Sequence, residues 1–541
     1  MINFRRRRRV TAGLGLALAS AMALSACGGG DSSSGSGSGE SNELAANQEL
    51  TIAVSNMPAS LDPMAVLGAN PRRYDIYEAL FDYDPQTAAI KPMLATEWTQ
   101  ETPTTVRIKL RTDAKFSDGT PFTAEDVQFS LDRAARDENP LATNSILDSY
   151  AQTEIVDDHT VIVHTTTPDA MILSKLARIA MLPKAYYNSL GATDADRDAA
   201  FAEAPIGTGP YKVESHDTTQ VVLVQNEQTW RDPILTKVTV RNITDPASQI
   251  AAFTSGQAQY INLVPLTSVK QLEATGATLL TYRAGNSLGA FMDTVDSTGA
   301  PKTGPMGDKR VRQAINHAID RETLVKDVLQ GLTETDKGQL ASPKAFGHNS
   351  SITDYTYDVA LAERLLDEAG YPKGADGTRF TITMASAFAG PGSVRRLIGE
   401  FVQNQLSKVG INVQYETLTD PTLQSDLFYG RKPRQDIFHY GLFTRPYMDP
   451  AGAYNWFRST NSAKHYNNPE FDQLYVQQQQ ELDPAKREQL LARMAEILHE
   501  DAPYLFLTQD VWIDAAKPNL KGVIVSEVET EQYLDQLYFT K

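Results

Sequence analysis

Residues 105–127 read TVRIKLRTDAKFSDGTPFTAEDV, and they contain a strand, a turn and the start of a helix in direct succession. Thr105 to Leu110 alternate apolar and polar side chains, as half-buried strands do. Asp118-Gly119-Thr120-Pro121 is typical of a tight turn. Thr123 is a favourable N-cap for a helix that begins at Ala124. The stretch therefore predicts strands and helices mixed within one fold.

The same two patterns recur on both sides of this stretch. Apolar alternation or short apolar runs predict strands at 50–54, 160–164, 220–224, 411–415 and 503–507. Beyond residue 300, apolar residues at helical spacing follow polar N-cap residues, and helices are expected after Asp308, Asp320, Asp358, Ser393 and Asp483. The predicted class is mixed α/β, with helices packed on sheets.

The N-terminus has the layout of a bacterial export signal. Arg5 to Arg9 form a basic region, and Val10 to Ala23 form an apolar region too short to span a bilayer. The following Leu24-Ser25-Ala26-Cys27 resembles a lipobox. This resemblance implies cleavage of residues 1–26, acylation of Cys27 and retention at the outer face of the cytoplasmic membrane. The alternative is an ordinary signal peptide that leaves Cys27 as a free thiol.

Residues 28–47 are mostly glycine, serine and small polar residues, and they predict a flexible linker whose ends lie about 25 Å apart. The 515 residues after the predicted leader suffice for about three structural units or two large lobes. They carry 45 basic and 67 acidic residues, and the resulting net charge of −22 disfavours nucleic acid and anionic lipid as partners. Cys27 is the only cysteine, so we expect neither disulfides nor a thiolate metal site.

A series of short motifs identifies a family. In chain order, they are 92–95 with Trp98, 110–111, 116–121, 124–127 with Ser130, 206–211, 310–315, 320–322, 368–371, 409–411, 449–450 and 501–503. The series covers roughly residues 50–515 and resembles the large extracytoplasmic solute-binding proteins of ABC importers, the peptide/nickel-binding family 5. Of the glycines in it, Gly119, Gly207 and Gly209 suit turns that need unusual backbone angles.

The resemblance implies a two-lobed periplasmic-binding-protein-like α/β fold, of type II and the large cluster C type. The implied division is 48–92, 205–293 and 508–541 for the first lobe, 93–204 for an extra subdomain of it, and 294–507 for the second lobe. The chain is expected to cross between lobes near Phe291–Val295 and Phe506–Val511. The implied protein is a monomer without a cofactor, touches the membrane only through its lipid, and works with an ABC permease and ATPase.

An enzyme is the competing class. Gly285-Asn286-Ser287-Leu288-Gly289 fits the G-x-S-x-G elbow of serine hydrolases, which requires a strand before the serine and a helix after it. Residues 290–295 have no helical periodicity, so we expect no catalytic residue, with a hydrolase using Ser287 as the alternative. The histidines suggest no metal site: His159 and His164 lie on opposite faces of one predicted strand.

The solute-binding segment departs from the peptide-binding members of the family. Pro446 stands where these members carry the aspartate that holds a peptide's ammonium group. Phe388 falls, in an ungapped alignment, at the position of the arginine that binds a dipeptide's carboxylate. Neither end of a dipeptide therefore has its usual partner.

Aromatic residues around this segment are the candidate ligand-binding residues, together with Phe388: they are Phe443, Tyr447, Tyr454 and Trp456. Asp449 either receives an ammonium group in a shifted pose or caps the following turn. The expected solute is peptide-like, and the alternative is a non-peptide solute such as an oligosaccharide or a metal chelate. A binding module without a transporter is a third interpretation.

Overall fold

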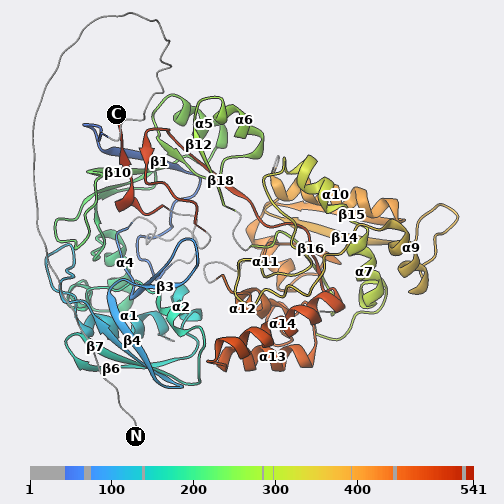
Figure 1. Ribbon diagram of the computed structural model, residues 1–541, viewed down its shortest axis with the longest axis horizontal. Coiled ribbons are helices and arrows are strands. Elements are labelled where there is room, and N and C mark those ends of the chain that lie inside the picture. Colours follow the sequence, from blue (N-terminus) through green and yellow to red (C-terminus); the bar gives the residue numbers. More distant parts are fainter. Residues whose placement is uncertain are drawn as a thin grey trace, which may run out of the picture. The chain divides into compact units, whose positions relative to one another are not determined.

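The computed structural model describes residues 43–65, 75–136, 141–282, 286–296, 298–390, 393–442, 448–526 and 532–541. The predicted leader, Cys27 and most of the linker lie outside these ranges, as do Phe443, Pro446 and Tyr447. Residues Glu43–Lys541 form one compact unit, and two large sheets organise it (Figure 1).

The first sheet has seven strands in the order β12-β18-β11-β1-β10-β9-β8. Their bounds are β1 Glu49–Val54, β8 Tyr211–His216, β9 Gln220–Gln225, β10 Lys237–Asn242, β11 Tyr260–Ile261, β12 Thr278–Tyr282 and β18 Trp512–Ala516. Central strand β1 runs parallel to both of its neighbours, β10 and β11. Helices α5 (Pro246–Thr254) and α6 (Val269–Glu273) follow strands β10 and β11 in the chain. We call residues 43–282 and 512–541 lobe I.

Lobe I also contains a four-stranded antiparallel sheet in the order β4-β5-β7-β6. Its strands are β4 Ala95–Thr102, β5 Thr105–Leu110, β6 Tyr150–Asp157 and β7 Thr160–Thr165. Helix α1 (Ala124–Ala135) packs on it, and Thr123 and Asp126 form the capping box of this helix. The predicted strand and N-cap of the stretch 105–127 are thus confirmed. The strand pair β2 (Phe81–Tyr83) and β3 (Ile90–Pro92) and helices α2 (Ile172–Leu176), α3 (Lys184–Ser189) and α4 (Asp194–Glu203) complete this region.

The second large sheet has five strands in the order β15-β14-β16-β13-β17, and we call residues 290–505 lobe II. Its strands are β13 Ala290–Met292, β14 Phe380–Ala387, β15 Ile411–Leu418, β16 Ile437–His439 and β17 Tyr504–Leu505. Its main helices are α7 Lys309–His317, α8 Arg321–Thr323, α9 Val359–Glu368, α10 Val394–Lys408, α11 Pro421–Phe428, α12 Ala451–Tyr454, α13 Pro469–Gln480 and α14 Pro484–Asp501. All five predicted N-caps accept a backbone N–H bond from the helix they begin: Asp308, Asp320, Asp358, Ser393 and Asp483.

The chain passes between the sheets in two segments. The first connects β12 to β13, so it ends before Ala290 and not at the predicted Phe291–Val295. Strand β13 pairs with β16 on one side and β17 on the other, and its three residues are fully buried. The family resemblance counted residues 290–293 with the first lobe, whereas β13 pairs within the five-stranded sheet. A short apolar run does not reveal which sheet it joins. The second segment, between β17 and β18, coincides with 506–511.

Two glycines in the family motifs serve a different purpose from the one expected. Gly119 has a φ of +88° in its turn, as predicted. Gly207 and Gly209 do not have left-handed backbone angles, and each packs against another backbone segment instead. A Cβ at Gly207 would lie 2.0 Å from the Ile76 carbonyl oxygen, and one at Gly209 would lie 2.1 Å from that of Asp75. Close approach, rather than backbone angle, therefore requires glycine at these two positions.

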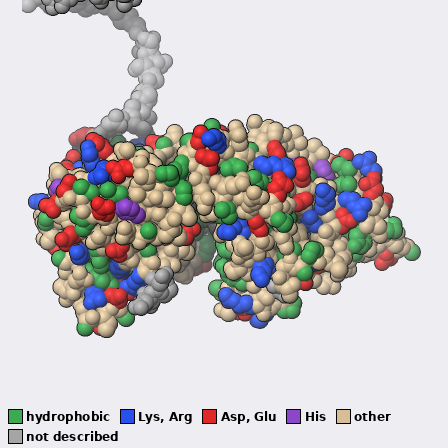
Figure 2. Space-filling view, turned by 90° about the horizontal axis from the view of Figure 1, so that it is seen from below, with side chains coloured by type: hydrophobic (Ala, Val, Ile, Leu, Met, Phe, Trp, Pro, Cys, Tyr) green, Lys and Arg blue, Asp and Glu red, His purple; other side chains and the backbone are tan. Residues whose placement is uncertain are grey.

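On the face shown in Figure 2, acidic and basic side chains are interspersed. No helix in the described ranges combines the length and apolar character needed to cross a bilayer.

Candidate solute-binding site

The parallel strands of lobe II end at one edge of its sheet. Strand β14 runs parallel to both β15 and β16 (Figure 1). The chain goes from β14 through α10 to β15, and then returns past β14 to reach β16 on its other side. Ligands of open α/β sheets bind beyond the carboxyl ends of the strands where the direction of strand addition reverses in this way. This edge is therefore the candidate site.

Aromatic rings cover the edge. Phe388 directly follows β14 and Tyr440 directly follows β16, and their ring centroids lie 6.0 Å apart. Buried Phe428 lies 4.9 Å from Tyr440 and 5.1 Å from Trp456. Tyr429 adjoins Phe428 at 5.2 Å. We call Phe388, Tyr429, Tyr440 and Trp456, with Phe428 behind them, the aromatic wall.

Phe388 is the most exposed member of the wall. Its side chain is 53% exposed, and its φ of +52° is uncommon for a residue with a Cβ. An exposed ring on a backbone of higher energy is a feature of binding sites more than of packing. Phe388 and Trp456, both expected from the sequence as ligand-binding residues, are thus brought into one surface.

Two cations of the described chain lie against this wall. The guanidinium carbon of Arg431 is 5.3 Å from the centroid of the Tyr429 ring, and Arg431 forms an ion pair with Asp426 at 3.4 Å. The guanidinium carbon of Arg395, in the first turn of α10, is 5.4 Å from the centroid of the Phe388 ring. A Cβ at Gly441, the residue after Tyr440, would lie 3.3 Å from Nη2 of Arg395. The absence of a side chain at Gly441 gives the guanidinium its space.

A buried histidine lies beneath the wall and is uncharged at neutral pH. His439 is fully buried at the end of β16, and its Nδ1 lies 3.0 Å from Oγ of Ser386. Burial, and next the charge of Arg395, lower the pKa of His439 to about 3. Arg395 therefore supplies the positive charge at this edge without a second one from His439.

Two other predicted ligand-binding residues are engaged in the interior of lobe II. Asp449 receives hydrogen bonds from both Nη1 and Nη2 of buried Arg487. Asp449 also accepts the backbone N–H of Ala451 at 2.9 Å. It therefore caps the following turn, which is the second of the two roles considered for it from the sequence. Asp449 is buried, and both of its oxygens accept hydrogen bonds from lobe II. Tyr454 is fully buried and packs edge-on against Phe471 at 5.9 Å.

Comparison with known proteins identifies the family. The family model of the bacterial extracellular solute-binding proteins, family 5, matches residues 89–465, well over half of the chain. This protein belongs to family 5. Its relatives include the glutathione-binding protein GsiB of Pectobacterium atrosepticum, which is 28% identical over 497 residues, 89% of this chain and 92% of that protein.

Solved structures agree with the fold. NikA from Brucella suis in complex with Fe(III)-EDTA has a TM-score of 0.80 at 24% identity, over 91% of this chain and 100% of that chain. DppA from Helicobacter pylori in complex with the peptide STSA has a TM-score of 0.74 at 23% identity, over 92% and 99%. The two-lobed fold and the assignment to the solute-binding proteins of ABC importers are thus confirmed, and the protein is a binding protein rather than an enzyme.

The surroundings of Ser287 show why the hydrolase motif is coincidental in this family 5 protein. Its Oγ donates to Oδ2 of Asp336 at 2.5 Å, and its backbone pairs with Leu442. The next element in the described chain is strand β13, so the helix that a nucleophile elbow requires is replaced by a strand. Nor do the described residues contain a group of three His, Cys, Asp or Glu side chains able to hold a metal ion.

Asp336 connects the two crossing segments. Besides Ser287 in the first segment, its carboxylate accepts the Leu507 N–H at 3.2 Å and the Gln509 amide at 2.9 Å in the second. Burial raises the pKa of Asp336 above its usual range. Ser287 thus belongs to a hydrogen-bond network that joins the two crossing segments.

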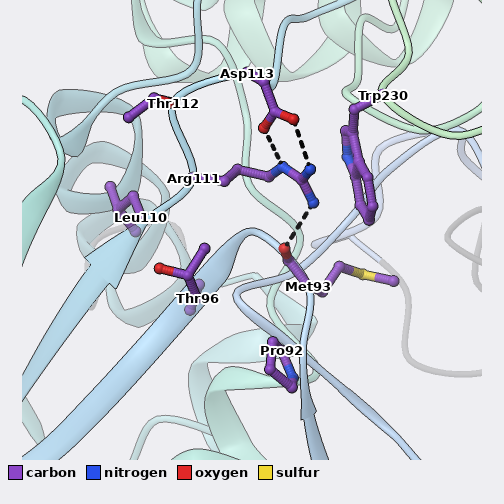
Figure 3. Close-up of a pocket in the computed structure, with 9 residues that line it drawn as sticks. Pro92, Met93, Thr96, Leu110, Arg111, Thr112, Asp113 and Trp230 are labelled. Carbon is purple, nitrogen blue, oxygen red and sulfur yellow. Dashed lines mark hydrogen bonds and ion pairs between the residues drawn. The ribbon is translucent and has the colours of Figure 1, made fainter. Parts of the chain in front are cut away.

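A separate hollow of about 730 Å³ lies in lobe I, and Figure 3 shows the residues that line it. Arg111 fills its centre, with two hydrogen bonds to Asp113 and its guanidinium stacked 3.3 Å from the Trp230 ring centroid. Met93, at a family motif, contributes its carbonyl oxygen at 3.4 Å. The charged groups of Arg111 and Asp113 are already paired with each other. We therefore interpret the hollow as part of the packing of lobe I and not as the solute site.

Sequence reasoning missed Arg395, Tyr429 and Tyr440. Two adjacent arginines in the first turn of a helix were the available signal, because cations there oppose the helix dipole. Tyr429 and Tyr440 carry no comparable local signal, since their exposure depends on how α11 and β16 pack.

Proposed function

We propose that this family 5 protein is a lipid-anchored receptor that captures a peptide-like solute between its lobes and delivers it to an ABC permease powered by an ATPase. The observation that carries the proposal is the aromatic wall at the carboxyl ends of β14 and β16, in a chain of this family. Partly exposed rings give a peptide apolar faces on which to pack. The glutathione-binding relatives support a short peptide-like solute.

The mechanism follows from the two crossing segments. A solute that contacts both lobes stabilises the closed form by its greater affinity for that form. The permease then recognises the closed receptor. The receptor acts as a monomer and releases the solute chemically unchanged.

Cys27 is proposed as the anchor, because a diacylated N-terminal cysteine holds a protein stably at the outer face of the cytoplasmic membrane. The proposal predicts that Cys27→Ala releases the protein from washed membranes. A Cys27→Ala protein that stays with the membrane fraction contradicts it.

The solute itself is tested by purifying the protein, denaturing it and identifying any released molecule by mass spectrometry. A peptide or glutathione-like molecule is expected. Release of a sugar or a metal chelate would refute the peptide-like class and support the alternative, a non-peptide solute. Proteins of similar fold have been solved in complex with Fe(III)-EDTA and Ni(L-His).

The site is tested with Trp456→Ala. Loss of a stacking ring is expected to weaken binding of the identified solute about tenfold, as measured by calorimetry. The matched control is Tyr371→Ala, which removes a ring packed 5.1 Å from Phe380 at the opposite end of β14. Equal affinities of the two variants would remove the aromatic wall from the solute site.

A further inference from the structure

Arg395 is a partly buried cation without a counter-ion in the described part of the chain. Its guanidinium makes no hydrogen bond or ion pair with any described residue, and its ring contact is with Phe388 at 5.4 Å. The neighbouring Arg396 differs: its Nε donates to Glu400 at 2.9 Å, one helical turn further on. Of these two adjacent arginines, Arg396 has a carboxylate partner in the described chain and Arg395 has none.

The position of Arg395 is electrostatically unfavourable for the protein alone. Its helix, α10, has no acidic residue in its first turn, and a cation there faces the positive end of the helix dipole. Partial burial adds to this cost because it removes water from the guanidinium without supplying a partner. An anion placed at this point would relieve both effects.

The surroundings are suited to an external anion. The Phe388 ring lies against the guanidinium, and the Tyr440 ring lies 6.0 Å from that of Phe388. Gly441, beside the guanidinium, has no side chain. Attraction between opposite charges is stronger beside low-dielectric rings than in water. The planar fork of a guanidinium matches a carboxylate with two parallel hydrogen bonds.

We propose that Arg395 binds a carboxylate of the solute and that the solute packs on the rings of Phe388 and Tyr440. The proposal rests on the function proposed above and adds its chemical class, a peptide-like acid. Arg395 lies inside α10. The position before this helix, where dipeptide-binding members carry an arginine, is occupied by Phe388. The same arrangement would select against a solute whose carboxylate is amidated, because the guanidinium would then stay unpaired.

The experiment compares Arg395→Gln with Arg396→Gln in the full-length protein. Glutathione, trialanine and trialanine amide are the probes, and calorimetry at pH 7 and 0.15 M salt measures their affinities. Arg395→Gln should weaken binding of the free acids about 10- to 100-fold and leave the amide unchanged. Arg396→Gln should bind all three like the wild type. Arg395→Lys, which keeps the charge without the fork, should fall between them.

Folding is checked by thermal melting. Because Arg395 makes no hydrogen bond within the described chain, Arg395→Gln should melt at the wild-type temperature or above it. A loss of binding together with a lower melting temperature in Arg395→Gln, but not in Arg395→Lys, would assign Arg395 a structural role and overturn the proposal.

The remaining outcomes separate the two proposals. A peptide acid bound equally by wild type and Arg395→Gln overturns the role of Arg395 and leaves the peptide receptor intact. A co-purified non-peptide anion that Arg395→Gln no longer retains refutes the peptide class and keeps the role of Arg395. If the wild type binds no probe and releases no anionic molecule, both are overturned.

Discussion

Replacing Asp449 tests whether this residue is a ligand-binding group or an internal partner of Arg487. The two side chains are 4% and 6% exposed, and two hydrogen bonds join them. The Nε of Arg487 also donates to the Gln478 carbonyl at 3.1 Å, so the guanidinium is held in place when Asp449 is lost. Asp449→Ala would leave this cation buried without a counter-charge.

Breaking a buried ion pair by removing one partner costs about 3–5 kcal/mol. Asp449→Ala should lower the free energy of unfolding of lobe II by this amount, and it also removes the N–H acceptor for Ala451. Asp449→Asn keeps that acceptor and should cost less. The double variant Asp449→Leu/Arg487→Met replaces both charges by apolar groups and should recover most of the loss, because no buried charge is left alone.

Urea unfolding followed by circular dichroism at pH 7 measures these differences, and calorimetry on the folded variants measures solute affinity. We expect Asp449→Asn to bind the solute like the wild type. Lost affinity in Asp449→Asn with unchanged stability would refute the internal role and restore Asp449 to the binding site.

Three further predictions concern packing, pH and the crossing segments. Gly207→Ala should cost about 3 kcal/mol or more in thermal unfolding, because its Cβ would lie 2.0 Å from a carbonyl oxygen. Gly256→Ala, with open space but a φ of +80°, should cost about 1–2 kcal/mol; equal costs would contradict the close-packing argument. His439 takes up a proton near pH 6.5 when unfolded but only near pH 3 when folded, so stability should fall by about 1.4 kcal/mol per pH unit below 6.5. His439→Gln should lack this component, and parallel pH profiles would disprove it. Ser287→Ala removes a donor to buried Asp336 and should cost about 1.5–3 kcal/mol in urea unfolding, whereas no cost would show that Ser287 does not stabilise the network between the crossing segments.

The local features of the fold were predictable. Thr123, Asp308, Ser393 and Asp483 are N-caps in the structure as in the sequence, because a cap depends on the few residues that follow it. Strand β5 was predicted for the same reason, since alternation of side chains is a property of the strand itself. The family motifs then supplied the two-lobed fold that local patterns alone do not specify.

What the sequence by itself determined is therefore the class, the family and the starts of helix α1 and of five helices of lobe II, because these follow from short stretches of neighbouring residues. The tertiary structure alone decided that β13 joins lobe II, that Asp449 belongs to Arg487 and that Phe388 shares a surface with Trp456. It also distinguished Arg395 from Arg396, which are adjacent and identical in chemistry. Arg396 pairs with Glu400 one helical turn further along α10, whereas Arg395 points to the ends of the strands. The physical reason is that charge pairing depends on distances, and folding sets these distances.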